Sequence, residues 1–233
     1  MSRRPLRQTS CRLHHITTRG NNRQAMFDDA EDRERFYDLL GTGLAAGNVD
    51  CHADVQMGNH VHLLLGGAIS DVSTLMWFVS HRYALAYNRR HGRMNHLLGR
   101  RFHSSSVPDA FAARAICVYI AMNPVRAGLC AHPREWAFGS FHAHAIGEAP
   151  RPHVTPDLVH DLFATRQTGF GAAVDAAVAR EQGGRPRLAA ILPPLDRLTQ
   201  EHVRHARQVY GYTVPQIASH YRQGARSIPA MAR

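Results

Sequence analysis

The sequence predicts an α+β fold: a ferredoxin-like antiparallel sheet with helices on one face, followed by a C-terminal helical segment. Two observations carry this prediction. Short segments are rich in β-branched residues or alternate in polarity, whereas longer segments repeat apolar residues at helical spacing. Their order along the chain is strand, helix, strand, strand, helix, strand, which is the order of the ferredoxin-like fold.

Residues 11–48 supply the first strand and the first helix. Residues 11–18 alternate loosely and are rich in β-branched side chains, so they predict a strand. The polar residues 19–23 then predict a turn. Asp28 and Asp29 can cap the helix that follows, because its first turn is acidic and its apolar residues recur at helical spacing up to a Gly-Asn pair.

The remaining elements follow from the same two periodicities. They are strands at 49–57, 60–65 and 100–107, and helices at 71–90 and 109–122. Gly58 and Asn59 join the first two of these strands as a tight hairpin turn. We expect Pro124 to stop the last helix, because proline lacks the backbone N–H that would continue it.

The charge balance indicates a nucleic-acid-binding protein. The chain of 233 residues carries 28 Lys+Arg against 18 Asp+Glu, a formal net charge of +10, and every basic residue is arginine. A GC-rich coding sequence can account for the missing lysine, but it does not account for the sign of the charge. Guanidinium groups bind phosphate through paired hydrogen bonds. The missing lysine excludes Schiff-base chemistry and a Walker-type phosphate site.

Composition also indicates the compartment. No apolar run is long enough to span a membrane, and the first residues are polar and do not form a signal-peptide core. The four cysteines are scattered without a Cys-x-x-Cys pair, which indicates neither a disulfide framework nor a zinc ribbon. These observations predict a cytoplasmic protein.

His60 and His62 form a candidate metal site. They are separated by one residue of a predicted strand, so both side chains project from the same face. Two imidazoles spaced in this way can bind one divalent ion. Because the chain contains 17 histidines, a pair of exposed or packed histidines without a metal is the alternative interpretation.

Tyr119 and Asn123 are a second candidate pair. They stand four residues apart in an otherwise apolar helical segment and therefore share a face. A tyrosine hydroxyl can act as a nucleophile, and an amide oxygen is a suitable ligand for magnesium or manganese. Spacing alone favours the alternative, in which Tyr119 is a core residue and Asn123 caps the helix before Pro124.

Four motifs then occur in one order: HITTRGNNR at 15–23, MGNHVHLLL at 57–65, YALAYNRRHGR at 83–93 and YIAMNPVRAGL at 119–129. This order resembles the single-tyrosine HUH transposases (IS200-like), and most of all the REP-associated tyrosine transposases. The resemblance spans roughly residues 11–142 and includes WAFGS at 136–140, where the family has an aromatic–Ser-Ser segment. The sequence departs from the family at Gly58, a usual proline, and at Asn95, a usual glycine. Neither belongs to the expected chemistry, although Gly58 can loosen the hairpin turn.

The resemblance implies a mechanism. His60 and His62 would hold Mg²⁺ or Mn²⁺ with Asn123 as third ligand, and Tyr119 would attack the scissile phosphate to leave a 5′-phosphotyrosine. The implied substrate is single-stranded or hairpin DNA. Two other classes compete: a DNA-binding protein that keeps the fold but is catalytically idle, and a zinc hydrolase. Residues 63–65 are all leucine, whereas a zinc hydrolase places further ligands there.

Arginines and amides cluster around the motifs, and as a group we expect them to contact the DNA backbone. They are Arg19, Asn21, Asn22, Arg23, Arg89, Arg90, Arg93, Arg100 and Arg101. For any single arginine, solvated surface charge is the alternative. Tyr83 and Tyr87 share an amphipathic helix with apolar residues, so we expect them to pack in the core.

We expect three parts along the chain. They are a catalytic domain at 1–146, a Pro/Gly/Ala-rich linker at 147–195 and a helical tail at 196–233. Residues 213–221 resemble the start of a helix-turn-helix that would add DNA affinity, and a two-helix cap is an equal alternative. The resemblance to the REP-associated branch favours a monomer over a homodimer.

Overall fold

A computed structural model describes residues 12–99, 101–164 and 169–183, together with the single positions 199, 202, 203 and 217. The predicted helical tail at 196–233 therefore lies, apart from these single positions, outside the described residues, as does Arg100. The chain divides into two compact units. The first comprises residues 1–121 and 137–172, and the second comprises 122–136 and 173–233.

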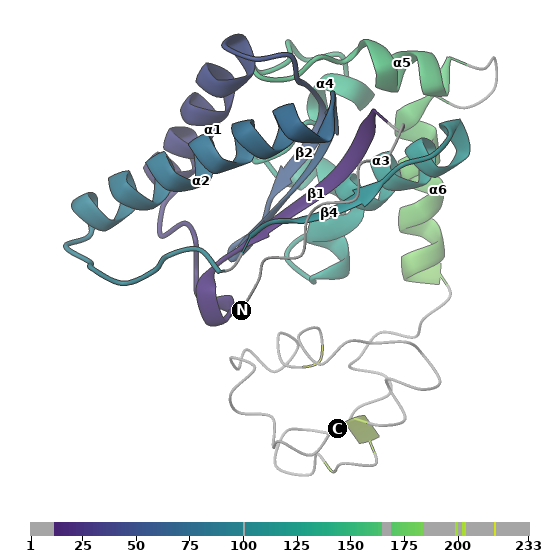
Figure 1. The fold of residues 1–233 in the computed structure, drawn as a ribbon. Helices are drawn as coiled ribbons and strands as arrows, with labels where there is room; N and C mark the ends of the chain where they lie inside the picture. The colour runs from purple at the N-terminus through teal and green to yellow at the C-terminus, as the bar shows by residue number, and fades with distance from the viewer. Residues whose placement is uncertain are drawn as a thin grey trace. The chain divides into compact units, whose positions relative to one another are not determined.

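The first unit contains an antiparallel sheet of four strands in the order β2–β3–β1–β4 (Figure 1). The strands are β1 (Leu13–Arg19), β2 (Asp50–Gln56), β3 (His60–Gly66) and β4 (His103–Ser106). Helix α1 (Ala30–Ala45) joins β1 to β2, and helix α2 (Ile69–Arg90) joins β3 to β4. The predicted ferredoxin-like order is thus confirmed. Strand β4 is shorter than the expected strand at 100–107 and lies within it.

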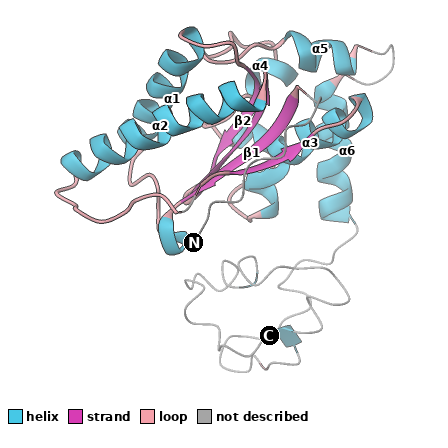
Figure 2. Ribbon diagram, in the orientation of Figure 1, coloured by secondary structure: helices cyan, strands magenta, loops and turns pink. Residues whose placement is uncertain are grey.

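The core lies between the sheet and the first two helices, which lie together on one side of the strands (Figure 2). Ile16 of β1 and Leu63 of β3 are paired and fully buried. They pack with Phe36 and Leu40 of α1 and with Met76 of α2. Because side chains alternate along a strand, the intervening residues of β1 and β3 face away from α1 and α2.

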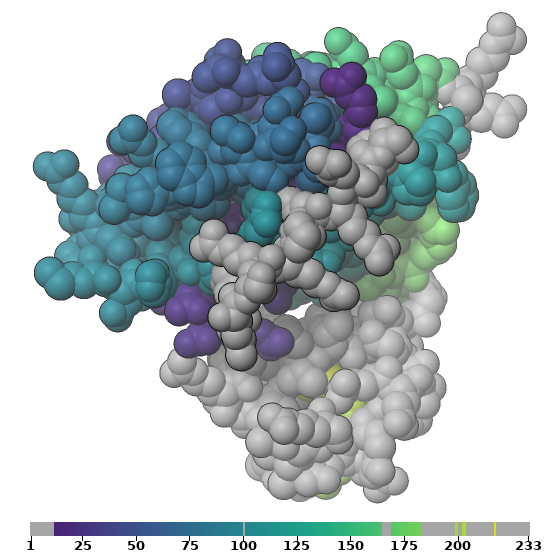
Figure 3. All heavy atoms as spheres, viewed as in Figure 1, coloured from purple at the N-terminus to yellow at the C-terminus, as the bar shows by residue number. Residues whose placement is uncertain are grey.

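Tyr83 and Tyr87 belong to this core, as predicted, and each is 1% exposed. The Tyr83 hydroxyl donates to the backbone carbonyl of Met26, and the Tyr87 hydroxyl donates to Asp28 Oδ2 at 2.9 Å. Both phenols are therefore used in packing the inner side of α2. The outer side of the same helix forms part of the protein surface (Figure 3).

The β2–β3 turn is held firmly although it contains Gly58. The Met57 N–H donates to the carbonyl of His60 at 2.8 Å, which closes the turn. The Gly58 carbonyl accepts the N–H of Met26 at 2.9 Å, and the Asn59 carbonyl accepts the N–H of Gly20 at 2.9 Å. These two outside contacts restrain the turn where we expected the glycine to loosen it.

Helix α3 (Ala110–Arg126) corrects our expectation that Pro124 ends it. The helix continues through Pro124 and stops at Gly128, whose φ of 71° is left-handed. There the Gly128 N–H donates to the Val125 carbonyl, and the Leu129 N–H donates to the Pro124 carbonyl, both at 2.9 Å. This pair of bonds is a Schellman cap, in which glycine supplies the reversal that ends a helix. Proline removed one backbone donor but did not reverse the chain.

Our linker prediction at 147–195 is also incomplete. The described part of this segment contains helices α5 (Asp157–Phe163) and α6 (Phe170–Gly183), and the shorter elements η2 (Pro133–Glu135) and α4 (Phe141–Ala145) precede it. Val159 and Val174 are fully buried. Helix α5 gave a weak signal because it is short, and α6 because its large side chains are widely spaced among alanines and glycines. Across the described ranges, no helix combines the length and apolar character that a membrane crossing requires.

Candidate active site

The pairing of β1 with β3 gathers polar side chains on the face opposite to α1 and α2. Thr17 pairs with His62, and Arg19 pairs with His60. Because alternate residues share a face, His15 joins this group. His15 and Thr17 were not among our predicted site residues. Their spacing placed them on one face, but the register that brings them beside His62 was not apparent from the sequence.

His62 presents one ring nitrogen to its neighbours and leaves the other without a partner. Its Nδ1 lies 3.0 Å from His15 Nε2 and 3.1 Å from Thr17 Oγ1. Its Nε2 is buried and has no hydrogen-bond partner among the described residues. A proton assigned to Nδ1 satisfies the first set of contacts and leaves a lone pair on Nε2. A buried acceptor left in this way costs about 1–3 kcal/mol unless a ligand satisfies it.

His60 has the same arrangement with a different partner. Its Nδ1 lies 2.6 Å from the side-chain oxygen Oδ1 of Asn59, so this nitrogen is assigned the proton. The rings of His60 and His62 meet edge to face, with centroids 4.9 Å apart and planes at 86°. Metal-binding histidines usually donate the other ring N–H to a fixed acceptor, as His60 does here and as His62 does in the tautomer assigned above.

Burial keeps these histidines neutral. For His60, burial and then the charge of Arg19 lower the pKa to about 4. For His62, burial is the main cause, and the neighbouring His60, His15 and Arg19 add to it because each disfavours a further positive charge there, which lowers the pKa to about 3. Burial, followed by His103, also lowers the pKa of His15. A neutral imidazole is the form that binds a metal ion.

Tyr119 of α3 lies against these rings. Its ring centroid is 5.5 Å from that of His62, with the planes at 90°, and 5.7 Å from that of His15. Tyr119 is 37% exposed, whereas Tyr83 and Tyr87 are buried on the inner side of α2. Among these three tyrosines, Tyr119 is therefore the one that an external phosphate can reach.

A cavity of about 600 Å³ opens beside Tyr119 and His62. Three arginines line it: Arg19, Arg23 and Arg101. Asn22 also lines it, so four of the predicted DNA-binding residues lie together at one site. A polar, arginine-lined cavity beside a phenol and two imidazoles is suited to bind a phosphodiester.

Among the residues that the structure describes, the other predicted DNA-binding side chains do not line this cavity. Arg90 forms ion pairs with Asp29 and Asp32 at the start of α1. Arg93 donates to Gln24 Oε1 at 2.7 Å. Arg89 is exposed near the end of α2, and Asn21 is half-buried at the start of the short 3-10 helix η1 (Asn21–Arg23).

Asn123 lies one helical turn beyond Tyr119 and is 9% exposed. Its backbone carbonyl accepts the N–H of Ala127 at 2.9 Å, so it is an internal residue of α3. The alternative that Asn123 caps the helix is therefore wrong, because the helix ends only at Gly128. Tyr119 belongs to the first unit and Asn123 to the second. The expected role of Asn123 as the third metal ligand stays a prediction.

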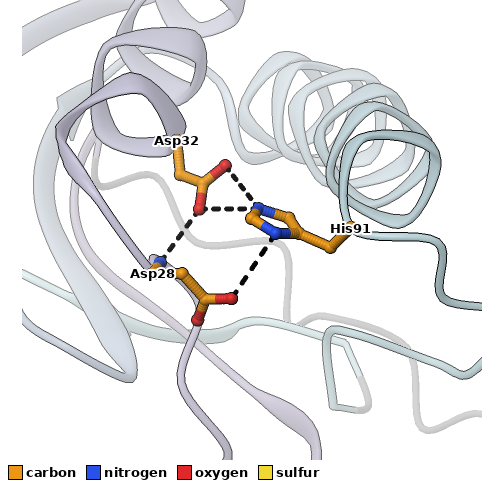
Figure 4. A group of neighbouring side chains, drawn as sticks. All are labelled: Asp28, Asp32 and His91. Carbon is orange, nitrogen blue, oxygen red and sulfur yellow. Dashed lines mark hydrogen bonds and ion pairs between the residues drawn. The ribbon is translucent and has the colours of Figure 1, made fainter.

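Asp28, Asp32 and His91 form another group, whose potential ligand atoms lie within 4.8 Å of one another (Figure 4). His91 Nε2 lies 3.0 Å from both carboxylate oxygens of Asp32, and Arg90 Nη1 lies 2.7 Å from one of them. Burial by itself would raise the pKa of Asp32, but hydrogen bonds from His91, the Asp28 N–H and Arg90 together lower it. Because Arg90 already compensates the buried carboxylate, we interpret this group as a clamp between α1 and α2.

Comparison with known proteins adds a family and a fold. The family model described as IS200-like transposase matches residues 8–123. The solved structure of a REP-associated tyrosine transposase bound to a REP hairpin is similar, with a TM-score of 0.54 and 16% identity over 72% of this chain and 97% of that chain. A putative transposase from Deinococcus radiodurans R1 has a TM-score of 0.36 and 20% identity over 50% of this chain and 92% of that chain. No curated protein matches this chain.

Proposed function

Through residues 8–123 the chain belongs to the IS200-like transposase family and is a transposase, and from this premise we propose that it cleaves and rejoins single-stranded DNA at hairpin sequences with Tyr119 as the nucleophile. One observation carries the proposal. Tyr119 is an accessible tyrosine that lies against His62 and His15 at an arginine-lined cavity. The similar REP-associated enzyme was solved with a REP hairpin, which supports a hairpin as the substrate.

The donor set fits a divalent ion. His62 Nε2 is buried with no partner among the described residues, and the contact of His60 Nδ1 with Asn59 keeps the lone pair of that neighbouring ring on Nε2. Among the residues described, no third histidine, cysteine or acid joins these two in a group of ligand atoms. An amide oxygen from Asn123 would complete the set, and oxygen ligands favour Mg²⁺ or Mn²⁺. When bound, such an ion polarises the scissile phosphate and offsets the charge that develops on it.

The side chains of this chain perform the remaining steps. Arg19, Arg23 and Arg101 bind the backbone phosphates and orient the strand. The Tyr119 oxygen forms a bond to phosphorus as the P–O3′ bond breaks, so that the phenol loses its proton and the departing 3′-oxygen gains one. The product is a 5′-phosphotyrosine and a free 3′-hydroxyl. Attack by a second 3′-hydroxyl reverses this exchange and joins two strands without ATP, because the phosphodiester bond energy is conserved.

A hairpin oligonucleotide tests this proposal. We expect the wild-type protein, with Mg²⁺, to form a covalent adduct with an imperfect palindrome taken from the DNA that flanks the gene. The same sequence as a fully paired duplex is the control and should form none, because the backbone of a rigid double helix cannot bring its scissile phosphate into the cavity beside Tyr119. Denaturing gel electrophoresis of end-labelled DNA separates the adduct. Tight hairpin binding without any adduct would instead identify a catalytically idle DNA-binding protein.

Substitution of Asn123 tests its proposed role as an oxygen ligand. Asn123→Ala should shift cleavage to higher Mn²⁺ concentration, whereas Asn123→Asp keeps an oxygen and should retain part of the activity. Cleavage is measured against Mn²⁺ concentration, with the melting temperature as the control. A lowered melting temperature with unchanged Mn²⁺ dependence would give Asn123 a packing role only.

We also propose that the active unit is a monomer. The described site draws His60, His62 and Tyr119 from one chain. A single copy therefore supplies the nucleophile and both imidazoles, which supports the monomer that the sequence favoured.

A further inference from the structure

We propose that Asn59 is a positioning residue for this reaction: its side-chain amide sets the ring tautomer of His60 and also holds the turn that presents Arg23 to DNA. This inference rests on the proposed function, in which His60 binds the ion and Arg23 binds phosphate. Asn59 lies in the turn between β2 and β3, directly before His60. Its carboxamide contacts two parts of the site that are 37 positions apart in the chain, His60 and Arg23.

The first contact determines where the His60 proton resides. Asn59 Oδ1 lies 2.6 Å from His60 Nδ1. A carboxamide oxygen only accepts hydrogen bonds, so the ring must donate from Nδ1 and keep its lone pair on Nε2. The opposite tautomer would place two lone pairs against each other. Asn59 therefore selects the form of His60 that can bind an ion through Nε2.

The second contact restrains the turn at residues 20–23. Asn59 Nδ2 donates to the backbone carbonyl of Arg23 at 3.1 Å, and the Asn59 carbonyl accepts the Gly20 N–H at 2.9 Å. Asn22 and Arg23 have φ values of 49° and 61°, a left-handed backbone that residues with side chains rarely adopt. Such strained residues persist only where surrounding contacts hold them. Asn59 supplies two of those contacts.

Both contacts use opposite ends of one amide, so they are formed together. A flipped amide would turn its oxygen towards the Arg23 carbonyl, and because two acceptors cannot form a hydrogen bond, that contact would be lost whichever tautomer His60 adopts. The orientation of the amide is therefore unambiguous. Consequently, the tautomer of His60 and the conformation of the Arg23 turn both depend on the Asn59 carboxamide.

Two substitutions separate the two contacts. Asn59→Ala removes both of them. Asn59→Asp keeps an oxygen that accepts the His60 Nδ1–H, but it has no N–H for the Arg23 carbonyl. Asn88→Ala is the matched control, because Asn88 Nδ2 also donates to a backbone carbonyl, that of Asn95 at 2.9 Å, and Asn88 does not line the cavity.

The tautomer of His60 is measured by NMR of the metal-free full-length protein labelled with ¹⁵N-histidine, and His60→Gln assigns the signal. We expect the proton on Nδ1 in the wild type, in Asn59→Asp and in Asn88→Ala, and a mixture of tautomers in Asn59→Ala. The proposal is overturned if the wild-type proton resides on Nε2, or if Asn59→Ala leaves the tautomer unchanged. If Asn59→Ala does not fold, Asn59→Asp provides the test. A His60 proton on Nε2 in that variant would equally refute the proposal.

The turn is tested by hairpin binding without metal. Loss of one such hydrogen bond should weaken hairpin affinity about fivefold in Asn59→Ala, with Asn59→Asp also weaker and Asn88→Ala within about twofold of the wild type. A wild type that does not bind the hairpin, or Asn59→Ala that binds it equally well, would refute the link to the Arg23 turn. Neither measurement uses cleavage. If both succeed while the wild type forms no adduct, the transfer mechanism fails and the role of Asn59 stands.

Discussion

Tyr119→Phe should reduce formation of the covalent DNA adduct by at least about a thousandfold, because it removes the oxygen that bonds to phosphorus. Hairpin binding should stay within a few-fold of the wild type, since the arginines that line the cavity are unchanged. End-labelled hairpin DNA on a denaturing gel measures the adduct, and a gel-shift assay measures binding. The substitution removes a single atom from a side chain that is already 37% exposed, so we expect little change in the melting temperature.

Tyr83→Phe is the matched control for this experiment. Tyr83 is 1% exposed, and its hydroxyl donates to the Met26 carbonyl inside the core. Its loss should lower the melting temperature but leave the adduct. An adduct that persists in Tyr119→Phe and disappears in Tyr83→Phe would show that we have assigned the wrong nucleophile.

His62→Ala should lower cleavage by at least about a hundredfold, and His60→Ala should have a similar effect. One remaining imidazole with an amide binds a hard ion weakly, and even changes in groups that only support a metal ligand cost 10–100-fold. EDTA should inhibit the wild type to the same degree, and excess Mg²⁺ or Mn²⁺ should restore it. Binding of Mn²⁺, followed by its electron paramagnetic resonance signal, gives a readout that does not depend on cleavage.

His81→Ala is the control for the histidine variants, because His81 is exposed on α2 and does not line the cavity. It should leave both Mn²⁺ binding and cleavage unchanged. Full wild-type cleavage in EDTA would refute metal assistance, whatever the histidine variants show.

The elements of the fold were largely predictable because their signals are local. Strand alternation placed His60 and His62 on one face, and helical spacing placed Tyr119 and Asn123 on another. Pro124 was misleading, because a proline lowers the stability of a helix but a left-handed residue such as Gly128 is what reverses the chain. Helix α5 was missed because it spans only Asp157–Phe163, and α6 because alanine and glycine fill most positions between its buried residues.

The roles of individual residues depended much more on packing. Three tyrosines occur in the motifs: Tyr83, Tyr87 and Tyr119. The first two are buried on the inner side of α2 and are therefore not accessible to DNA. Of the predicted DNA-binding arginines, Arg19, Arg23 and Arg101 line one cavity, whereas Arg90 forms ion pairs with α1.

The sequence by itself therefore determined the order of strands and helices, the His-x-His pair and the family resemblance. The elements and the shared face of the two histidines depend on periods of two and of about 3.6 residues, which the backbone of a single element imposes. The family resemblance depends on the order of four sequence motifs. Only the tertiary structure decided that His15 and Thr17 support His62, and that Asn59 bonds to both His60 and the Arg23 turn. Those contacts depend on the register between strands and on the path of a turn, and both are set by the packing of segments that are distant in the sequence.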